Sequence, residues 1–327
     1  MMEKVELILH EKGRLIEREI ESVIPREGIK NLNDAVWYHL DSGGKRIRPV
    51  LAILTCESLG GDTQKVLKFA AACEILHNWL LIHDDIEDGD RIRRNKPAVW
   101  VKYGTAHGIN IGDFMSEKVY ELVLRSELDE KTKLLLIEEI VETCTKTSEG
   151  QTLDMNLRKN NNPSEDEYMR MVEMKTAWYL TLPMVGGAII AGRPELVESI
   201  KEFGMRIGPA FQIADDLLDL TEGKGRNEIG SDIKEGKRSI MVVHCSSKCT
   251  PEERKRLFDI LNKPREETEK EDVEFLKNLF EKYGSLEYAK NKAKSLVEES
   301  RRITSNMPEK LREILDEFAE YLVERKR

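Results

Sequence analysis

The chain has few cysteines and few aromatic residues. Its 327 residues include five cysteines, an odd number, and no two of them form a C-x-x-C pair. This argues against a disulfide framework and against a zinc site, and it favours a reducing cytoplasm. Aromatic residues make up only 6% of the sequence, and helix formers dominate over β-branched runs.

No hydrophobic run is long enough to cross a bilayer. The longest apolar stretch, at 180–192, is interrupted by Thr181, Pro183 and two glycines. A transmembrane helix needs about 20 consecutive apolar residues. The first four residues already carry charge, and the N-terminal segment shows no signal-peptide pattern. We therefore expect a soluble cytoplasmic protein without membrane insertion.

A broad basic surface is also missing. The net charge of −9 argues against a nucleic-acid partner. Positive charge gathers instead in two short segments, G-K-R-I-R at 44–48 and R-I-R-R-N-K at 91–96. Local clusters of this kind suit a small polyanionic substrate.

What the sequence does have is helical periodicity along most of its length. The pattern predicts helices at 5–23, 33–40, 50–59, 64–88, 112–124, 131–158, 164–190, 194–220, 238–246, 251–261, 271–283, 285–306 and 308–327. No window alternates as a strand, and no linker-like composition divides the chain. We therefore predict one all-α domain over residues 1–327. Two charged loops, at 89–97 and 221–238, have the composition of functional lids.

Two acidic clusters follow apolar helical segments. They read D-D-I-E-D at 84–88 and D-D-L-L-D at 215–219. The first and fifth positions of such a motif lie on one helix face, where carboxylates repel each other. Mg²⁺ reverses that repulsion, because it prefers oxygen ligands and keeps positions open for substrate phosphates. If the two acidic faces turn toward each other, they would hold a small Mg²⁺ cluster and a bound diphosphate.

Other polar residues align with these carboxylates. With 61 Asp and Glu in the chain, a single D-D-x-x-D could be a solvated surface, but two in apolar contexts favour a site. On a helix, His77 lies within about 20° of Asp84, and Gln212 lies within about 60° of Asp215. A lone histidine in an apolar helix is usually a core residue. The alignment with Asp84 and Asp88 instead favours a site role.

The wider pattern resembles the trans-isoprenyl diphosphate synthases, or polyprenyl synthetases. The matching segments are G-G-K-R-I-R-P at 43–49, H-D-D-I-E-D at 83–88, R-R-N-K-P at 93–97, E-G-Q at 149–151, K-T at 175–176 and G-P-A-F-Q-I-A-D-D-L-L-D at 208–219. They come in the family's order, and residues 83–112 look most like archaeal short-chain members. The resemblance implies the all-α isoprenoid synthase fold, with ten or more helices around a central cavity, in a homodimer.

The resemblance also implies an activity. Such an enzyme condenses isopentenyl diphosphate with allylic diphosphates (dimethylallyl, geranyl or farnesyl) and uses two to three Mg²⁺ ions per site. Loss of diphosphate leaves an allylic cation, the double bond of isopentenyl diphosphate attacks it, and a proton then leaves, we expect to the departing diphosphate. A dry cavity must protect the cation. We expect C15 and C20 products.

The matching positions imply residue roles. Asp84, Asp88 and Asp215 would ligate Mg²⁺, and Asp85 and Asp219 would support the metals directly or through water. The groups holding the allylic diphosphate would be Arg93, Lys175 and Lys237. Isopentenyl diphosphate would bind to Lys45, Arg48, His77 and Arg94, with bidentate arginine geometry. The reacting centre would be lined by Thr176 and Gln212.

One position departs from the family pattern. Many members have a lysine where this chain has Asn227, and Lys224 or Arg226 could substitute for it.

The family often sets product length with bulky residues before the first aspartate, which here are Leu76, Trp79 and Leu80. Trp79 should block long chains, although an ideal helical wheel points it away from Asp84 and Asp88.

Three alternative classes share some of these features. A class I terpene cyclase usually replaces the second cluster with an N-x-x-x-S-x-x-x-E type of site and lacks the pocket predicted at Lys45, Arg48 and His77. A di-iron bundle needs two E-x-x-H motifs, and only the one at 74–77 is present. A non-catalytic synthase subunit would be expected to have lost one acidic cluster, and both are intact.

Overall fold

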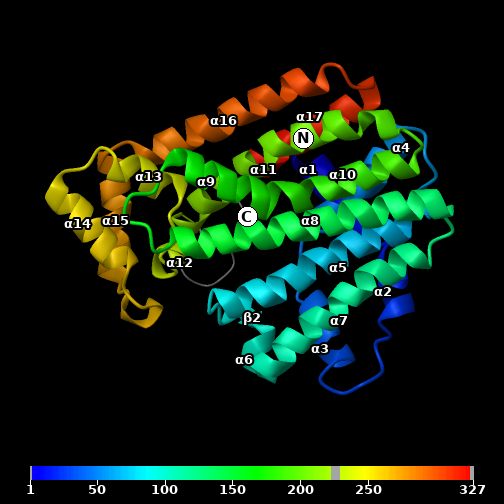
Figure 1. Ribbon diagram of the computed structural model, residues 1–327, viewed down its shortest axis with the longest axis horizontal. Helices are drawn as coiled ribbons and strands as arrows, with labels where there is room; N and C mark the ends of the chain where they lie inside the picture. Colours follow the sequence, from blue (N-terminus) through cyan, green and yellow to red (C-terminus); the bar gives the residue numbers. More distant parts are fainter. Residues whose placement is uncertain (1, 222–228, 325–327) are drawn as a thin grey trace. The chain divides into compact units, whose positions relative to one another are not determined.

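The computed structural model describes residues 2–221 and 229–324, and helices account for most of them (Figure 1). The elements are α1 (Met2–Gly13), α2 (Glu17–Val23), α3 (Asn33–Leu40), α4 (Ile47–Ser58), α5 (Thr63–Glu87), β1 (Ile92–Arg93), β2 (Lys96–Pro97), α6 (Val99–Tyr103), α7 (Thr105–Leu124), α8 (Glu130–Leu157), α9 (Glu165–Val172), η1 (Glu173–Ala177), α10 (Trp178–Ile190), η2 (Pro194–Leu196), α11 (Val197–Asp219), α12 (Ser231–Lys234), α13 (Ile240–Ser246), α14 (Pro251–Leu261), η3 (Arg265–Glu267), α15 (Lys270–Lys282), α16 (Ser285–Thr304) and α17 (Glu309–Glu324). The predicted all-α class is confirmed.

The chain divides into two compact units. Unit 1 contains Met1–Thr143, Tyr179–Lys201 and Thr304–Phe318, and unit 2 contains Cys144–Trp178, Glu202–Ile303 and Ala319–Arg327. Whether these two units form the single domain predicted for residues 1–327 depends on how they pack together, so the single domain stays a prediction. Within the described residues, no helix has both the length and the apolar character needed to cross a membrane.

Three local features differ from the predicted elements. The helix predicted at 5–23 is two helices, α1 and α2, and the one predicted at 164–190 is interrupted by the π-helical turn η1. The segment at 92–97 forms a two-residue antiparallel hairpin, β1 with β2, so the prediction of no strand was wrong there. Short hydrogen-bonded pieces like these leave no periodic signal, because one turn is too short to repeat a pattern.

Unit 1 is built around α5. The Asp62 side chain caps its N-terminus by accepting a hydrogen bond from Gln64 N at 2.9 Å, and α4 and α7 pack against the helix. Small residues allow α10 to come close as well. A Cβ on Gly186 would lie 2.0 Å from the Phe69 ring, and one on Gly187 would lie 2.6 Å from the Ala52 carbonyl oxygen. The last turn of α5, with its aspartates, is therefore held by a rigid core.

Unit 2 is defined by capped helices and a buried arginine. Ser164 and Thr250 form capping boxes with Glu167 and Glu253, which confirms the helix starts predicted at these positions. Each cap stabilises its helix by about 1 kcal/mol. Arg238 is 1% exposed and donates hydrogen bonds to backbone and asparagine oxygens, among them Asn160 O at 3.0 Å. This arginine ties the loop that begins at 158 to the end of α14.

Because His39 is buried, we expect the stability of the fold to fall at acid pH. Burial lowers the pKa of His39 well below 6.5, the nearby charges of Arg94, Arg93 and Arg46 lower it further, and a hydrogen bond with Asn78 opposes them. Because the folded-state pKa lies below the unfolded value, this contribution to stability is complete above about pH 6.5 and is lost as the pH falls. We expect the free energy of unfolding to drop between about pH 7 and about pH 5, by up to about 1.4 kcal/mol per pH unit for this group.

Denaturant unfolding followed by circular dichroism measures this slope. His39→Asn should flatten it, whereas His107→Asn, at an exposed position, should leave it as in the wild type. An unchanged slope in the His39 variant would show that other groups cause the acid sensitivity.

Candidate active site

The first acidic cluster closes α5. Asp85 has a side chain only 1% exposed and accepts a hydrogen bond from Arg93 Nε at 2.8 Å, while Asp84 is 22% exposed with Arg93 3.9 Å away. Burial raises the pKa of Asp85 to about 6, and the charges of Asp84 and Asp90 add to this rise against the opposing effect of Arg93. The Asp85 carboxylate is therefore used to hold Arg93, while Asp84 keeps access to solvent.

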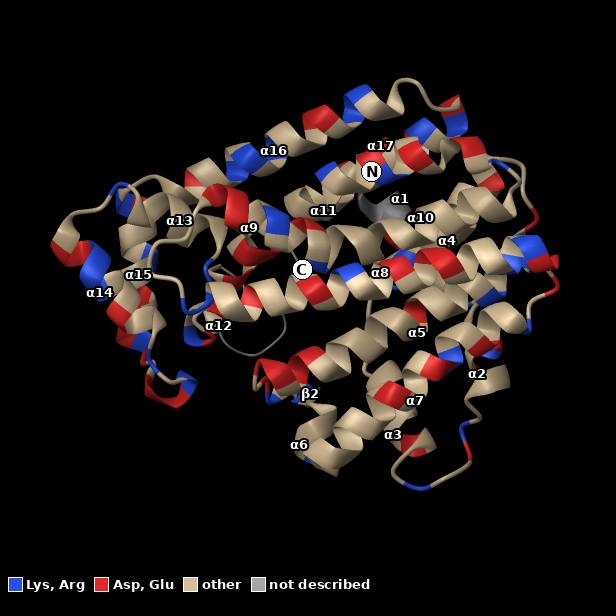
Figure 2. Cartoon of the chain, in the orientation of Figure 1, with Lys and Arg blue, Asp and Glu red and all other residues tan. Residues whose placement is uncertain are grey.

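The basic hairpin follows this cluster directly (Figure 2). Arg94 and Asn95 occupy its turn with φ of 51° and 61°, which is the left-handed pair of a type I′ turn. Arg93 thus binds Asp85, whereas Arg94 donates to the Gly43 carbonyl and lies 3.4 Å from Asn78 Oδ1. The turn sends the two neighbouring guanidinium groups to different partners.

The loop before α4 meets Arg94. Gly43 and Gly44 have φ of 104° and 125°, and a Cβ on Gly44 would lie 2.9 Å from Arg94 Nη2. Arg46 also has positive φ and forms an ion pair with Glu74, which is 2% exposed. The positive φ favours glycine at both positions, and at Gly44 the close approach of Arg94 also leaves no room for a side chain.

Arg48 and His77 share one aromatic neighbour. Arg48 is 6% exposed and lies 4.3 Å from the ring centre of Tyr179, and within the described residues its Nε has no hydrogen-bond partner. His77 stacks on Tyr179 with ring centres 6.0 Å apart. Burial and the charges of Arg48 and Arg94 lower the pKa of His77 well below 6.5. His77 is therefore a neutral hydrogen-bonding group at neutral pH.

Tyr179 was not among the predicted site residues. The only available signal was its position just after Lys175-Thr176, and an aromatic residue there looks like an ordinary core residue. The structure brings Arg48 and His77 together on this ring, as their shared predicted role requires. Lys45 lies on the loop directly before α4, and Arg48 is the second residue of that helix.

The second acidic cluster lies on α11 in unit 2, and its middle carboxylate is part of a hydrogen-bond chain. Asp216 accepts from Tyr168 Oη at 3.0 Å and from Gln212 Nε2 at 2.8 Å. Thr176 Oγ1 donates to Gln212 Oε1 at 3.0 Å. The structure thus joins the predicted residues Thr176 and Gln212. It also adds Tyr168 and Asp216, which the sequence did not single out as partners.

Asp219 is fully buried and anchors the chain after the loop. Its carboxylate accepts from Ser231 Oγ at 2.8 Å and from Asp232 N at 3.1 Å. Both oxygens therefore bond to the segment that begins α12. Asp215, which is partly exposed, remains as the cluster's carboxylate best suited to contact a ligand.

Lys175 and Thr176 lie on the π-helical turn η1. Lys175 Nζ is 2.8 Å from Asp154 Oδ2, and the same oxygen is 2.8 Å from Arg158 Nη2. A Cβ on Gly150 would lie 2.2 Å from the Lys175 backbone nitrogen, and one on Gly208 would lie 2.4 Å from the Ala177 Cα. Glycines of two sequence motifs therefore let α8 and α11 pack directly on this turn. Single π turns often mark functional sites.

Gly208→Ala should distort this turn. The added methyl group overlaps Ala177, so we expect a loss of about 1–3 kcal/mol in unfolding free energy and a lower kcat for any reaction that uses Lys175 or Thr176. Thermal unfolding and turnover measure the two effects. Glu202→Ala, at an exposed position of the same helix, is the control and should change neither. Wild-type stability in the Gly208 variant would contradict the close packing.

Lys237 lies at the end of the second charged loop. Its ammonium group is 3.3 Å from Asp232 Oδ1 and also pairs with Glu235, whose side chain is fully buried. Lys224, Arg226 and Asn227, together with the rest of 222–228, lie outside the described residues. Of the lid predicted at 221–238, the structure therefore describes Thr221 and residues 229–238.

The residues predicted to set product length occupy different environments on α5. Leu76 is 1% exposed, Leu80 is half-buried, and Trp79 Nε1 donates to His83 Nδ1 at 3.3 Å. His83 Nε2 in turn lies 3.2 Å from the Ile109 carbonyl oxygen of α7. Trp79 is thus oriented through His83 toward the α7 side of the helix, which agrees with the helical wheel.

The carboxylates fit a cation that needs few protein ligands. Among the described residues, no group of three or more His, Cys, Asp or Glu side chains could by itself hold a metal ion. Mg²⁺ usually binds through one or two carboxylates and completes its shell with water and substrate phosphates. Asp84 and Asp88 on one helix end, and Asp215 on another, match this donor chemistry.

Comparison with known proteins indicates the same family that the sequence motifs resemble. The family model for polyprenyl synthetase matches residues 29–280. A short chain isoprenyl diphosphate synthase from Methanothermobacter thermautotrophicus is 37% identical over 330 residues, 99% of each chain. The crystal structure of geranylgeranyl pyrophosphate synthetase from Pyrococcus horikoshii has a TM-score of 0.90 at 33% identity and covers 99% of both chains. A polyprenyl synthase from Caulobacter crescentus, complexed with calcium and isoprenyl diphosphate, has a TM-score of 0.90 at 25% identity and covers 100% of this chain and 98% of its own.

The chain belongs to the polyprenyl synthetase family. The predicted enzyme class, short-chain trans-isoprenyl diphosphate synthesis, is thereby confirmed, as is the isoprenoid synthase fold.

Proposed function

We propose that this enzyme joins isopentenyl diphosphate to dimethylallyl, geranyl and farnesyl diphosphates and releases C15 and C20 products. The observation that carries the proposal is the separation of two sets of cations in unit 1. Arg93 is fixed on the first acidic cluster, whereas Arg48 and Arg94 belong to a second group with His77 and the G-G-K-R-I-R-P loop. Two cation sets suit two diphosphates, whereas a terpene cyclase binds one.

The allylic diphosphate would bind at the acidic clusters. Asp84, Asp88 and Asp215 would hold two to three Mg²⁺ ions, with Asp85 and Asp219 supporting them through the contacts described above. When bound, Mg²⁺ neutralises charge on the leaving diphosphate. The Caulobacter relative, with calcium and isoprenyl diphosphate, supports this chemistry for the family. Arg93, Lys175 and Lys237 would add fixed positive charge.

Isopentenyl diphosphate would bind through Lys45, Arg48, Arg94 and His77. The buried guanidinium of Arg48 can offer a bidentate pair of donors, and Tyr179 holds its plane. Since His77 is neutral, it can donate a single hydrogen bond without adding charge. These groups would orient the substrate through its diphosphate head and leave its double bond free to react.

The carbocation would be stabilised by oriented dipoles. Because the Thr176 hydroxyl donates its proton to Gln212, its remaining lone pairs are available to an electron-poor carbon. Asp216 and Tyr168 fix the Gln212 amide in the orientation this requires. Dipoles held in place before the reaction need no reorganisation in the transition state.

We further propose a cytoplasmic homodimer in which the two units form one domain. All five cysteines are free thiols, which supports a reducing compartment. The dimer is supported by family resemblance alone. Sedimentation velocity at several concentrations tests the dimer, and a monomer throughout the range would contradict it.

The decisive experiment is turnover with labelled isopentenyl diphosphate, Mg²⁺ and each of the three allylic primers. Chain elongation is the expected result. Conversion of an allylic diphosphate to a cyclic hydrocarbon without use of isopentenyl diphosphate would indicate a terpene cyclase instead. Absence of turnover by the pure protein would indicate a non-catalytic subunit.

Trp79→Ala should lengthen the products. Removal of the indole opens space on the α7 side of α5, so a prenyl chain growing along that side could extend past C20. Chromatography of the dephosphorylated products measures the distribution. Lys65→Ala, at an exposed position of the same helix, is the control and should leave the distribution unchanged. An unchanged distribution in the Trp79 variant would remove this residue as the limit to chain length.

A further inference from the structure

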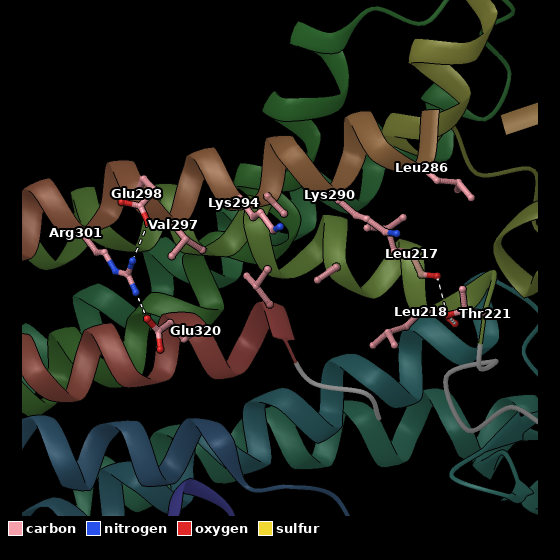
Figure 3. Close-up of a pocket in the computed structure, with 13 residues that line it drawn as sticks. Leu217, Leu218, Thr221, Leu286, Lys290, Lys294, Val297, Glu298, Arg301 and Glu320 are labelled. Atoms are coloured by element: carbon pink, nitrogen blue, oxygen red, sulfur yellow. Dashed lines mark hydrogen bonds and ion pairs between the residues drawn. The ribbon is translucent and has the colours of Figure 1, made fainter. Parts of the chain in front are cut away.

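Unit 2 contains a pocket that none of the roles above uses. It lies among α11, α16 and the end of α17, with a volume of about 600 Å³, which is within the range of about 300–1,000 Å³ typical of ligand pockets (Figure 3). Most of its lining is aliphatic, including Ala214, Leu217, Leu218 and Val297. No aromatic residue is among the described residues that line it. This chemistry suits a flexible hydrocarbon chain better than a stacked ring.

The charged residues at the pocket are of two kinds. The two carboxylates at the pocket, Glu298 and Glu320, are both neutralised by Arg301. Arg301 Nη1 donates a hydrogen bond to Glu298 Oε1 at 2.7 Å, and the guanidinium also pairs with Glu320. Lys290 and Lys294 are exposed, lie one turn apart on α16, and have no carboxylate partner in the described part of the chain. Two like charges at this spacing repel each other. The pocket therefore combines an aliphatic lining with two unneutralised positive charges.

We propose that this pocket binds a phosphate-headed amphiphile with a single hydrocarbon tail. A phosphate monoester carries a charge of about −1.5 to −2 at neutral pH, which matches two lysines, whereas a fatty carboxylate carries only one charge. The head lies between Lys290 and Lys294, and the tail lies along the leucines of α11. Inorganic phosphate has the head without the tail, so it binds more weakly.

The leucines connect this pocket to α11. Leu217 and Leu218 are the third and fourth residues of D-D-L-L-D, and at 100° per residue Leu217 points to the helix face opposite Asp215 and Asp219, whereas Leu218 lies about 60° from Asp215. An occupant therefore contacts the same helical turn that carries the second acidic cluster. Any effect of the bound amphiphile on enzyme turnover rests on the proposed function. Its binding to the pocket does not.

Isothermal titration of the full chain with dodecyl phosphate, in EDTA and below the detergent's micelle concentration, tests the binding. Saturable binding of one ligand per chain is expected. Lys290→Gln with Lys294→Gln should weaken it about tenfold or more. Leu286→Glu, which places a charge among the lining residues, should weaken it similarly. Lys131→Gln with Lys270→Gln removes the same charge at positions outside the pocket and should change the affinity less than twofold.

Three results would overturn the proposal: no saturable binding, equal losses in the pocket and control variants, or binding of dodecanoate but not of dodecyl phosphate. Farnesyl diphosphate in the same buffer shows whether a prenyl tail is accepted. Turnover with and without dodecyl phosphate is a separate measurement. An inactive protein that still binds the probe through Lys290 and Lys294 would contradict the proposed function and leave the pocket assignment standing.

Discussion

Replacing Asp84 with asparagine is expected to lower kcat about 1,000-fold, with little change in the unfolding temperature. The substitution keeps the shape of the side chain but removes the charge that would hold Mg²⁺ at the end of α5. Loss of one preorganised electrostatic contact to a leaving group typically costs about 10²–10³ in rate, and a metal ligand should lie at the upper end. Steady-state kinetics across a Mg²⁺ titration measure the effect, and higher Mg²⁺ should restore part of the activity.

Glu87→Gln is the matched control for this variant. Glu87 lies in the same helical turn, is exposed, and carries the same charge. Its neutralisation should change kcat less than threefold. Equal losses in both variants would mean that general acidity at this helix end, and not a specific ligand, supports the reaction. A fully active Asp84 variant would contradict the metal role.

The second large effect is expected at Arg48. Arg48→Gln should raise the KM for isopentenyl diphosphate about 100-fold and leave the KM for the allylic primer within about threefold. The reason is that a buried guanidinium contributes paired, charge-assisted hydrogen bonds to one diphosphate. Arg48→Lys keeps the charge but loses the paired geometry, so it should recover only part of the affinity.

Initial rates with each substrate varied in turn separate the two KM values. Arg125→Gln, at an exposed arginine of the same unit, is the control and should leave both unchanged. An equal rise in both KM values for the Arg48 variant would contradict the assignment of this residue to one diphosphate. It would point instead to a general loss of local structure.

The fold was predictable from the sequence where helices are long and capped. The helix at 64–88 carries an apolar pattern over seven turns, and the capping boxes at Ser164 and Thr250 mark starts that the structure confirms. Short elements were not predictable. The hairpin at 92–97 depends on positive φ at Arg94 and Asn95. Asparagine tolerates positive φ, but arginine does not favour it and the usual Asn-Gly or Asp-Gly pair is absent, so the residue types give only a weak turn signal.

The sequence predicted which residues form the candidate site, but not which hydrogen-bond and packing partners those residues have. The positions of the aspartates, arginines and His77 followed from motifs. Tyr168 and Tyr179 were missed, because their contacts come from tertiary packing: the Tyr168 hydroxyl reaches Asp216 across 48 residues of sequence. The π turn at 173–177 was missed for a similar reason. It coincides with the close approach of Gly150 and Gly208, which are remote in the sequence.

The sequence by itself determined the helices, the family and the chemical groups available for diphosphate and metal binding, because periodicity, caps and motif spacing are local properties of the chain. Only the tertiary structure decided how those groups are used. It commits Asp85 to Arg93, Asp216 to Tyr168 and Gln212, and Asp219 to the start of α12. A buried carboxylate needs hydrogen-bond donors, and which donors reach it depends on how the folded chain packs around it.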